Sequence, residues 1–302
     1  MKKLSRILRG GDVHWVGDGF PVRTIFSAQS LGSAASPFLL LDYAGPADFA
    51  PSDKPRGVGP HPHRGFETVT IIYSGEVEHR DSTGGGGRIG PGGVQWMTAA
   101  SGLVHEEFHG REFTKFGGTL EMIQLWVNLP AKDRSGPPHY QSIVIAEIPE
   151  VSLPEGAGRA RVIAGSLDGV RGPAKTLTPV NLWDLRLNAE SNAELTVPDG
   201  DNTLVFVLKG EIELAGGEII SDADLALFDP QGDSIILTAR DDAKLLIMDG
   251  EPINEPIVAH GPFVMNSEAE ILQAIDDYRN GRMGHLAGVA VGAVSCRQDG
   301  SP

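Results

Sequence analysis

Hydrophobic and polar residues along this chain alternate over short runs, which is the pattern of β-strands packed on one or both faces. The clearest runs cover residues 68–73, 94–97, 121–128 and 203–208, and they are rich in β-branched and aromatic residues. The chain has 39 glycines and 21 prolines, which suits many tight turns between short strands. A Pro-, Gly- and Asp-rich loop is expected over residues 44–59.

One stretch near the C-terminus has helical spacing instead. Apolar residues over 267–278 recur at helical intervals, and Ser267 with Glu270 three residues later forms a capping-box pattern. Gly281 is expected to end this helix. Residues 286–302, mostly small, are expected to form a flexible tail. The pattern therefore predicts an all-β chain with a short C-terminal helix.

An internal repeat divides the chain. Residues 68–79 align without a gap to residues 203–214, at an offset of 135 residues. Further on, Gly102 is best matched by Gly232 at an offset of 130, so an intervening loop is shorter in the second copy. A polar, Pro-containing linker at 131–138 is the expected boundary. The predicted organisation is a metal-binding β unit at 1–130, a degenerate copy with the helix at 131–285, and the tail at 286–302.

Two residue pairs in the first copy have the spacing of metal ligands. His61 and His63 are two residues apart, as are His105 and Glu107, and alternate residues of a strand point to the same face. Pro62 cannot donate to a β-ladder, so the first pair is expected at a strand start or sheet edge. Three imidazoles and one carboxylate suit a first-row transition metal.

Two neighbouring carboxylates compete with Glu107 for this role. Glu106 would face away from His105, so alternation favours Glu107. Glu67 lies two alternation steps beyond His63 and could also face the metal. His79, His109 and His139 are treated as surface or structural residues and are assigned no function.

The second copy lacks these ligands. At an offset of 135, His61 and His63 correspond to Thr196 and Pro198. The second pair corresponds either to Ile235 and Leu237 at an offset of 130, or to Arg240 and Asp242 at 135. Neither choice supplies a histidine, so one metal per chain is expected, in the first copy.

Charge and cysteine content narrow the class of protein. Lys and Arg total 25 against 40 Asp and Glu, and the net charge of −15 disfavours direct binding to nucleic acid or to anionic membrane. The single cysteine, Cys296, permits no intrachain disulfide, which fits a reducing compartment. The sequence has no apolar run long enough for a signal peptide or a membrane span. A cytoplasmic location is expected.

Four strings resemble the pirin family of the cupin superfamily. They are HPHRGFETVT, PGGVQWMTAASGLVHEE, IQLWVNLP and the C-terminal HGPFVMN, and the similarity runs over roughly residues 10–285. The resemblance implies two tandem cupin (jelly-roll) β-barrels, with metal ligands at His61, His63, His105 and Glu107. A general cupin signature would make Glu67 a ligand, but the pirin pattern takes the later carboxylate. Glu67 is then expected near the ligands or as a strand-to-strand partner.

The same resemblance implies an activity. It points to a quercetin 2,3-dioxygenase that acts on a flat aromatic flavonol, with Glu107 as ligand and proton acceptor. Iron is the first choice of metal, with zinc, manganese, nickel, copper and cobalt as alternatives. Pirin relatives also act as redox-dependent regulatory proteins, such as transcriptional coregulators or partners of metabolic enzymes, so a protein partner without turnover is the alternative.

Overall fold

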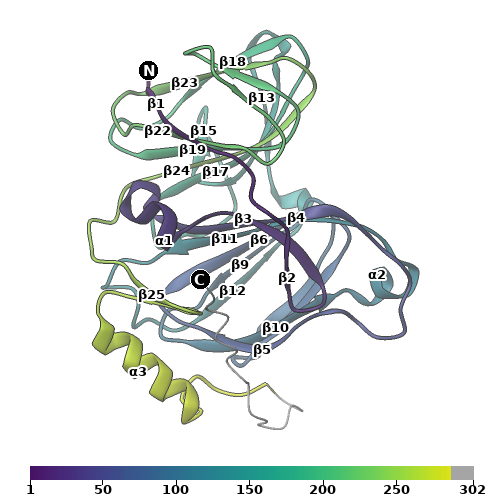
Figure 1. The fold of residues 1–302 in the computed structure, drawn as a ribbon, viewed down its shortest axis with the longest axis vertical. Helices are drawn as coiled ribbons and strands as arrows, with labels where there is room; N and C mark the ends of the chain where they lie inside the picture. The colour runs from purple at the N-terminus through teal and green to yellow at the C-terminus, as the bar shows by residue number, and fades with distance from the viewer. Residues whose placement is uncertain (287–302) are drawn as a thin grey trace.

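The computed structural model describes residues 1–286 as two β-barrels of jelly-roll type, one above the other in Figure 1, with a short C-terminal helix. The predicted fold class is confirmed. Apart from Leu286, which is buried, the predicted tail and Cys296 lie outside the described residues.

The first barrel pairs a large sheet with a small one. The large sheet has seven strands, in spatial order β12 (His139–Ile143), β9 (Val94–Thr98), β6 (Phe66–Ser74), β11 (Gly118–Asn128), β4 (Phe38–Phe49), β3 (Phe20–Ser27) and β2 (His14–Val16). The small sheet has four, in the order β5 (Gly57–His63), β10 (Leu103–His109), β7 (Val77–Asp81) and β8 (Gly86–Ile89).

The second barrel repeats this arrangement strand for strand. Its large sheet runs β1 (Leu4–Leu8), β22 (Leu225–Phe228), β19 (Asn202–Lys209), β24 (Ala243–Gly250), β17 (Val180–Leu187), β14 (Gly158–Ala164) and β13 (Glu150–Ser152). Its small sheet runs β18 (Ser191–Thr196), β23 (Ser234–Ala239), β20 (Ile212–Leu214) and β21 (Ile219–Ile220). The repeat seen in the sequence places β6 and β19 at the same position in the two sheets.

Each barrel receives an edge strand from the chain beyond it. The N-terminal strand β1 pairs with β22 of the second barrel, and β12, after the linker, pairs with β9 of the first. Strands therefore cross the boundary expected at residue 130 in both directions. The position of these edge strands depends on pairing between segments far apart in the chain, which the local composition around residue 130 does not reveal.

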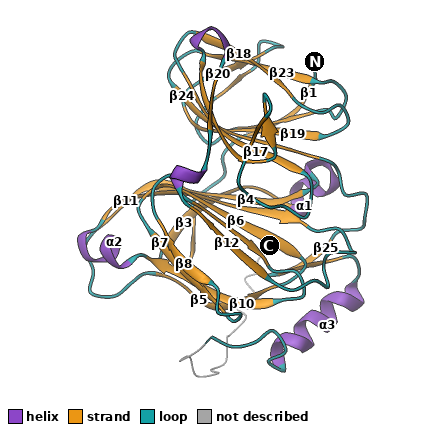
Figure 2. Ribbon diagram, turned by 180° about the vertical axis from the view of Figure 1, so that it is seen from behind, coloured by secondary structure: helices purple, strands orange, loops and turns teal. Residues whose placement is uncertain are grey.

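The two large sheets pack face to face and share one apolar core (Figure 2). Val69 and Ile71 of β6 lie in it with Leu204 and Phe206 of β19. Because alternate residues of a strand point to opposite faces, the residues between them on β6 point into the first barrel. This distinction decides which side chains can reach the predicted metal site.

The loop expected over residues 44–59 is shorter than its composition suggested. Strand β4 continues to Phe49 and β5 begins at Gly57, so residues 50–56 alone separate them. The continuation pairs with the start of β11, and a register shift in that pairing falls beside Gly45. Long-range pairing thus overrides the local glycine and proline signal.

Two short strand pairs and the helices complete the described chain. The strand pairs are β15 (Ser166–Leu167) with β16 (Val170–Arg171) and β25 (Val258–His260) with β26 (Phe263–Met265). The helices are α1 (Ala28–Leu31), α2 (Arg111–Phe116) and α3 (Glu268–Arg279), with single 3₁₀ turns η1 (Gly32–Ala35), η2 (Ile145–Glu147) and η3 (Pro154–Gly156). None of the helices over residues 1–286 has the length and apolar character that crossing a bilayer requires.

Helix α3 is the predicted C-terminal helix. Ser267 caps it by accepting a hydrogen bond from the Glu270 backbone N–H, and Glu270 accepts one from the N–H of Asn266. The helix packs on the first barrel rather than on the second, with Ile271 and Ala274 buried beside Val104 of β10. In Figure 1 it lies at the end of the molecule remote from the second barrel.

Candidate metal centre

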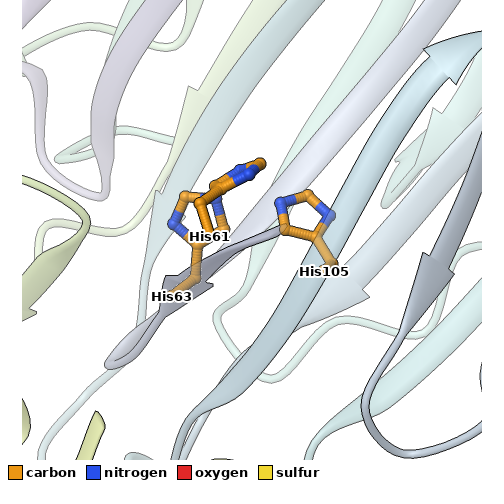
Figure 3. A group of neighbouring side chains, drawn as sticks. All are labelled: His61, His63 and His105. Carbon is orange, nitrogen blue, oxygen red and sulfur yellow. The ribbon is translucent and has the colours of Figure 1, made fainter. Parts of the chain in front are cut away.

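Strands β5 and β10 bring the three predicted histidines together. The two strands are antiparallel neighbours, and His61 lies directly opposite His105. Strand β5 is at the edge of its sheet, as Pro62 predicted. One ring nitrogen from each histidine lies within 4.8 Å of the others, and Figure 3 shows the rings turned toward one another. Their centroids are 4.2 Å (His61–His105), 4.8 Å (His63–His105) and 4.9 Å (His61–His63) apart.

The protonation and hydrogen bonding of these three imidazole rings suit metal binding. Burial, followed by the neighbouring His61 ring, lowers the pKa values of His63 and His105 well below their usual range, so both rings are neutral at pH 7. His63 Nδ1 and both nitrogens of His105 are buried without a hydrogen-bond partner. His61 Nδ1 lies 2.9 Å from the Gly59 carbonyl oxygen; it therefore carries the proton and leaves Nε2 as a donor atom. Neutral imidazoles with free nitrogen lone pairs are what a transition metal requires.

Glu107 lies in the same barrel but outside the group of three. The pairing of β10 with β5 shifts register between His105 and Glu107, and such a bulge changes where a side chain points. Its carboxylate Oε2 makes no hydrogen bond, and burial raises the pKa of Glu107 to about 7. Its place as a fourth ligand stays a prediction. Glu106 points the other way and forms an ion pair with Arg80, as alternation predicted.

The second barrel has filled the equivalent space with aliphatic side chains. Ile235 and Leu237, the counterparts of His105 and Glu107, are completely buried in its apolar core. Among residues 1–286, the three histidines form the one group of this kind. The geometry thus agrees with the expectation of a single site in the first copy.

Comparison with known proteins identifies the family. The pirin family model matches residues 19–127, and the model of the pirin C-terminal cupin domain matches residues 182–284. A pirin-like protein of Caulobacter vibrioides is 38% identical over 82% of this chain and 87% of its own length. The chain belongs to the pirin family. The resemblance inferred from the sequence motifs is confirmed.

Two further relatives of this pirin-family chain carry the name of an enzyme. A Pseudomonas aeruginosa protein provisionally named quercetin 2,3-dioxygenase is 56% identical over 93% of this chain and 98% of its own. The crystal structure of a quercetin 2,3-dioxygenase from Acinetobacter baumannii is 48% identical and superimposes with a TM-score of 0.92, covering 94% of this chain and 99% of that one. A bacterial pirin from Escherichia coli, solved with nickel(II), is 21% identical with a TM-score of 0.60 over 82% of this chain and 99% of that one, and it shows the shared fold.

His79 is a residue of this pirin site that sequence reasoning missed. It lies on β7 directly opposite Glu107, with its Nδ1 3.7 Å from Glu107 Oε2. Its ring stacks on that of His105 at 6.2 Å, and neither of its nitrogens has a hydrogen-bond partner. Burial lowers the pKa of His79 to about 3, so the ring is neutral. The register of β7 against β10 reveals this neighbour, and that register cannot be read from local spacing.

Glu67 faces away from the histidines. It shares a strand face with Val69, in the layer between the barrels, and its Oε1 accepts a 2.6 Å hydrogen bond from Thr98 Oγ1 on β9. Of the two expected roles, the structure supports the strand-to-strand partner. Alternation could not be carried from His63 to Glu67 because the chain turns at Gly65, whose φ is +92°.

Aromatic side chains form one wall beside His63. The rings of Phe66 and Trp126 stack at 4.3 Å, and both lie edge-on to His63, at 5.2 and 5.4 Å. Both residues come from the large sheet, from the faces of β6 and β11 that point into the barrel. The pirin site therefore combines nitrogen donors from the small sheet with flat apolar surface from the large one.

Proposed function

We propose that this chain is a metal-dependent dioxygenase that acts on a flavonol such as quercetin. One divalent transition metal would be held by His61, His63, His105 and Glu107, with iron as the first choice. The observation that carries the proposal is the convergence of three histidine rings, with one nitrogen from each within 4.8 Å of the others and with His63 Nδ1 and both nitrogens of His105 buried and unpartnered. It occurs in a chain 56% identical to a protein provisionally given this activity.

The residues around the site have definable tasks in this reaction. A bound redox-active metal would supply a Lewis acid for the substrate hydroxyl and an electron path to oxygen. Glu107, with a pKa of about 7, can accept the proton of that hydroxyl near neutral pH. Trp126, which is partly exposed and stacked on the buried Phe66, offers a flat surface to an aromatic ring.

The first test is metal content and oxygen uptake on protein purified without a tag. We expect about one metal per chain and oxygen uptake with quercetin that stops on chelation and returns with Fe²⁺. Reloading in turn with zinc, manganese, nickel, copper and cobalt would rank the alternative metals. Fully loaded protein without any uptake would favour the regulatory binding protein and a protein partner instead.

Location and other partners belong to the proposal as well. We propose a cytoplasmic location, because the chain has a single cysteine and so no intrachain disulfide. We also propose that it does not bind nucleic acid or membranes directly, because its net charge is −15.

A further inference from the structure

A row of polar side chains crosses the large sheet of the first barrel, one strand after another. In β3, β4, β11, β6 and β9 it consists of Thr24, Asp42, Gln124, Thr70 and Gln95, each directly opposite the next. Cross-strand neighbours lie close enough to interact. The row therefore forms one continuous polar strip, in which Thr24 Oγ1 donates a 2.6 Å hydrogen bond to Asp42 Oδ1.

The row points into the barrel. Gln124 lies between Ile123 and Leu125, and Thr70 lies between Val69 and Ile71; all four apolar neighbours belong to the core between the barrels. Asp42 and Gln124 are partly exposed although both are on inner strands of the sheet. Water therefore reaches the inside of this barrel at the level of the row.

Hydrogen bonding within the row is incomplete. Thr70 Oγ1 lies 2.6 Å from Gln124 Oε1 and 3.0 Å from Gln95 Oε1, but one hydroxyl proton serves only one of them. The other amide must turn its NH₂ group to Thr70. In either orientation, the oxygen or the nitrogen of the fully buried Gln95 amide is left without a partner. The buried hydroxyl of Thr68 also has no partner. Buried polar atoms without partners are costly and uncommon unless something else binds them.

The second barrel builds the same row from apolar residues. The counterparts, in the same strand-by-strand register, are Val162, Trp183, Ile247, Val205 and Ala226, and all are buried in its core. This sheet architecture thus forms without a polar row. The row, like the histidines, distinguishes the barrel that carries the candidate metal centre.

We infer that this row binds the polar end of a ligand whose other end meets the metal centre. Gln124 is two residues before Trp126 on β11, or ~7 Å along the strand, and Trp126 touches the ring of His63. A flat three-ring molecule spans that distance. The Asp42 carboxylate accepts hydrogen bonds from hydroxyl groups and repels anions, while the amide ends can serve either a hydroxyl or a carbonyl.

The ligand class that fits is a neutral polyphenol, and resting on the proposed function we assign the row to the hydroxyl groups of the distal ring of a flavonol. A bound ring without hydroxyl groups would displace water from the row and leave its donors and acceptors unsatisfied. The row should therefore discriminate strongly between hydroxylated and unhydroxylated rings.

The test compares two flavonols on the metal-loaded protein without oxygen, so that binding is measured apart from turnover. The probes are quercetin and the flavonol that lacks hydroxyl groups on the distal ring. We expect the native protein to bind quercetin about tenfold or more tightly. The double variant Thr70→Val, Gln124→Ile copies the second barrel and should lose that preference, with unchanged metal content. Gln124→Leu, at a half-buried position, serves if the double variant does not fold.

Thr98→Val is the matched control, because it removes a buried hydroxyl from the opposite face of the same sheet. It should keep the preference for quercetin. A preference that persists in the row variants would make the row a structural network and overturn the inference. Equal binding of both flavonols by the native protein, with turnover intact, would overturn the inference alone. Binding of neither would overturn it together with the proposed function.

Discussion

At the scale of single residues, the two barrels differ in where they keep polar atoms without partners. The first holds unpartnered imidazole nitrogens on His63, His79 and His105, whereas the second has Leu214 at the position of His79 and the indole Nε1 of Trp183 as its unpartnered nitrogen among the described residues. Leaving such atoms buried costs about 1–3 kcal/mol each, so their concentration in one barrel argues for a ligand that satisfies them.

The histidine assignments can be tested directly. His63→Ala and His105→Ala should each lower metal affinity by more than ~10–100-fold, the loss seen even for residues that only support a ligand. Both variants should remain folded, because each barrel has its own apolar core. Elemental analysis with circular dichroism measures both properties. Full metal occupancy in either variant would show that the ring is not a ligand.

Glutamine variants of three carboxylates test which one acts at the metal site. Glu107→Gln should weaken metal binding and nearly abolish flavonol oxidation, while Glu106→Gln and Glu67→Gln should change little, since both point away from the site. The pKa of about 7 means that Glu107 is protonated below neutral pH in the metal-free protein. Binding must then displace that proton, so metal affinity should fall as the pH drops through 7, and less so in Glu107→Gln. A loss in Glu106→Gln with Glu107→Gln intact would contradict the assignment.

His79 supports a separate prediction. Replacing it with the residue of the second barrel, His79→Leu, should lower metal affinity by ~10-fold because Glu107 loses its neighbour. The melting temperature should stay the same or rise, since a buried polar group without partners is removed. The exposed His139→Leu is the control. Unchanged metal affinity in His79→Leu would make its contact with Glu107 incidental.

At the scale of elements, residue spacing predicted the direction of side chains within one strand, because alternation along the strand sets it. It did not predict which strands are neighbours, because that depends on pairing between distant segments. His61, His63 and His105 were found because their spacing matches a strand, and Glu106 was turned outward by the same rule. The alternation of side-chain directions is interrupted by the turn at Gly65. The face to which the Glu67 side chain points could therefore not be derived from His63. The continuation of β4 and the pairing of β12 with β9 depend on partners far along the chain.

The crossing of β1 into the second barrel gives a prediction at this scale. Deleting residues 1–9 would expose the edge of β22 and remove the buried Lys2 ammonium, which donates to the carbonyls of Asp201 and Pro230. A loss of about 2 kcal/mol, or roughly 4–8 °C in melting temperature, is expected. Metal content should not change, because no residue of β1 lies in the first barrel. Lys2→Met should show a smaller loss, and metal loss in the deletion would contradict this separation.

At the scale of the whole molecule, the C-terminal helix closes the chain back onto the strands that carry the ligands. Arg64, the residue after His63, donates to Asp277 of α3 at 2.6 Å, and both side chains are mostly buried. Ser82 donates from its hydroxyl to the carbonyl of Met283 and accepts from the N–H of Val104, the residue before His105. The last described segment therefore holds β5 and β10 from outside the barrel.

This arrangement predicts that the helix slows metal loss. Asp277→Asn removes the charge that pairs with Arg64 and should cost about 1–3 kcal/mol of stability. Because His63 is the next residue, the metal should also dissociate faster into a chelator, by several-fold. Asp276→Asn is the matched control: its exposed carboxylate is adjacent on the same helix and shares the Arg282 partner with Asp277, whereas Arg64 pairs with Asp277. Chelator-driven release, followed by absorbance, would compare the two variants with the native protein. Equal release rates in both would mean that α3 stabilises the fold without acting on the metal centre, whereas faster release in Asp277→Asn alone would connect the C-terminal helix to the ligands.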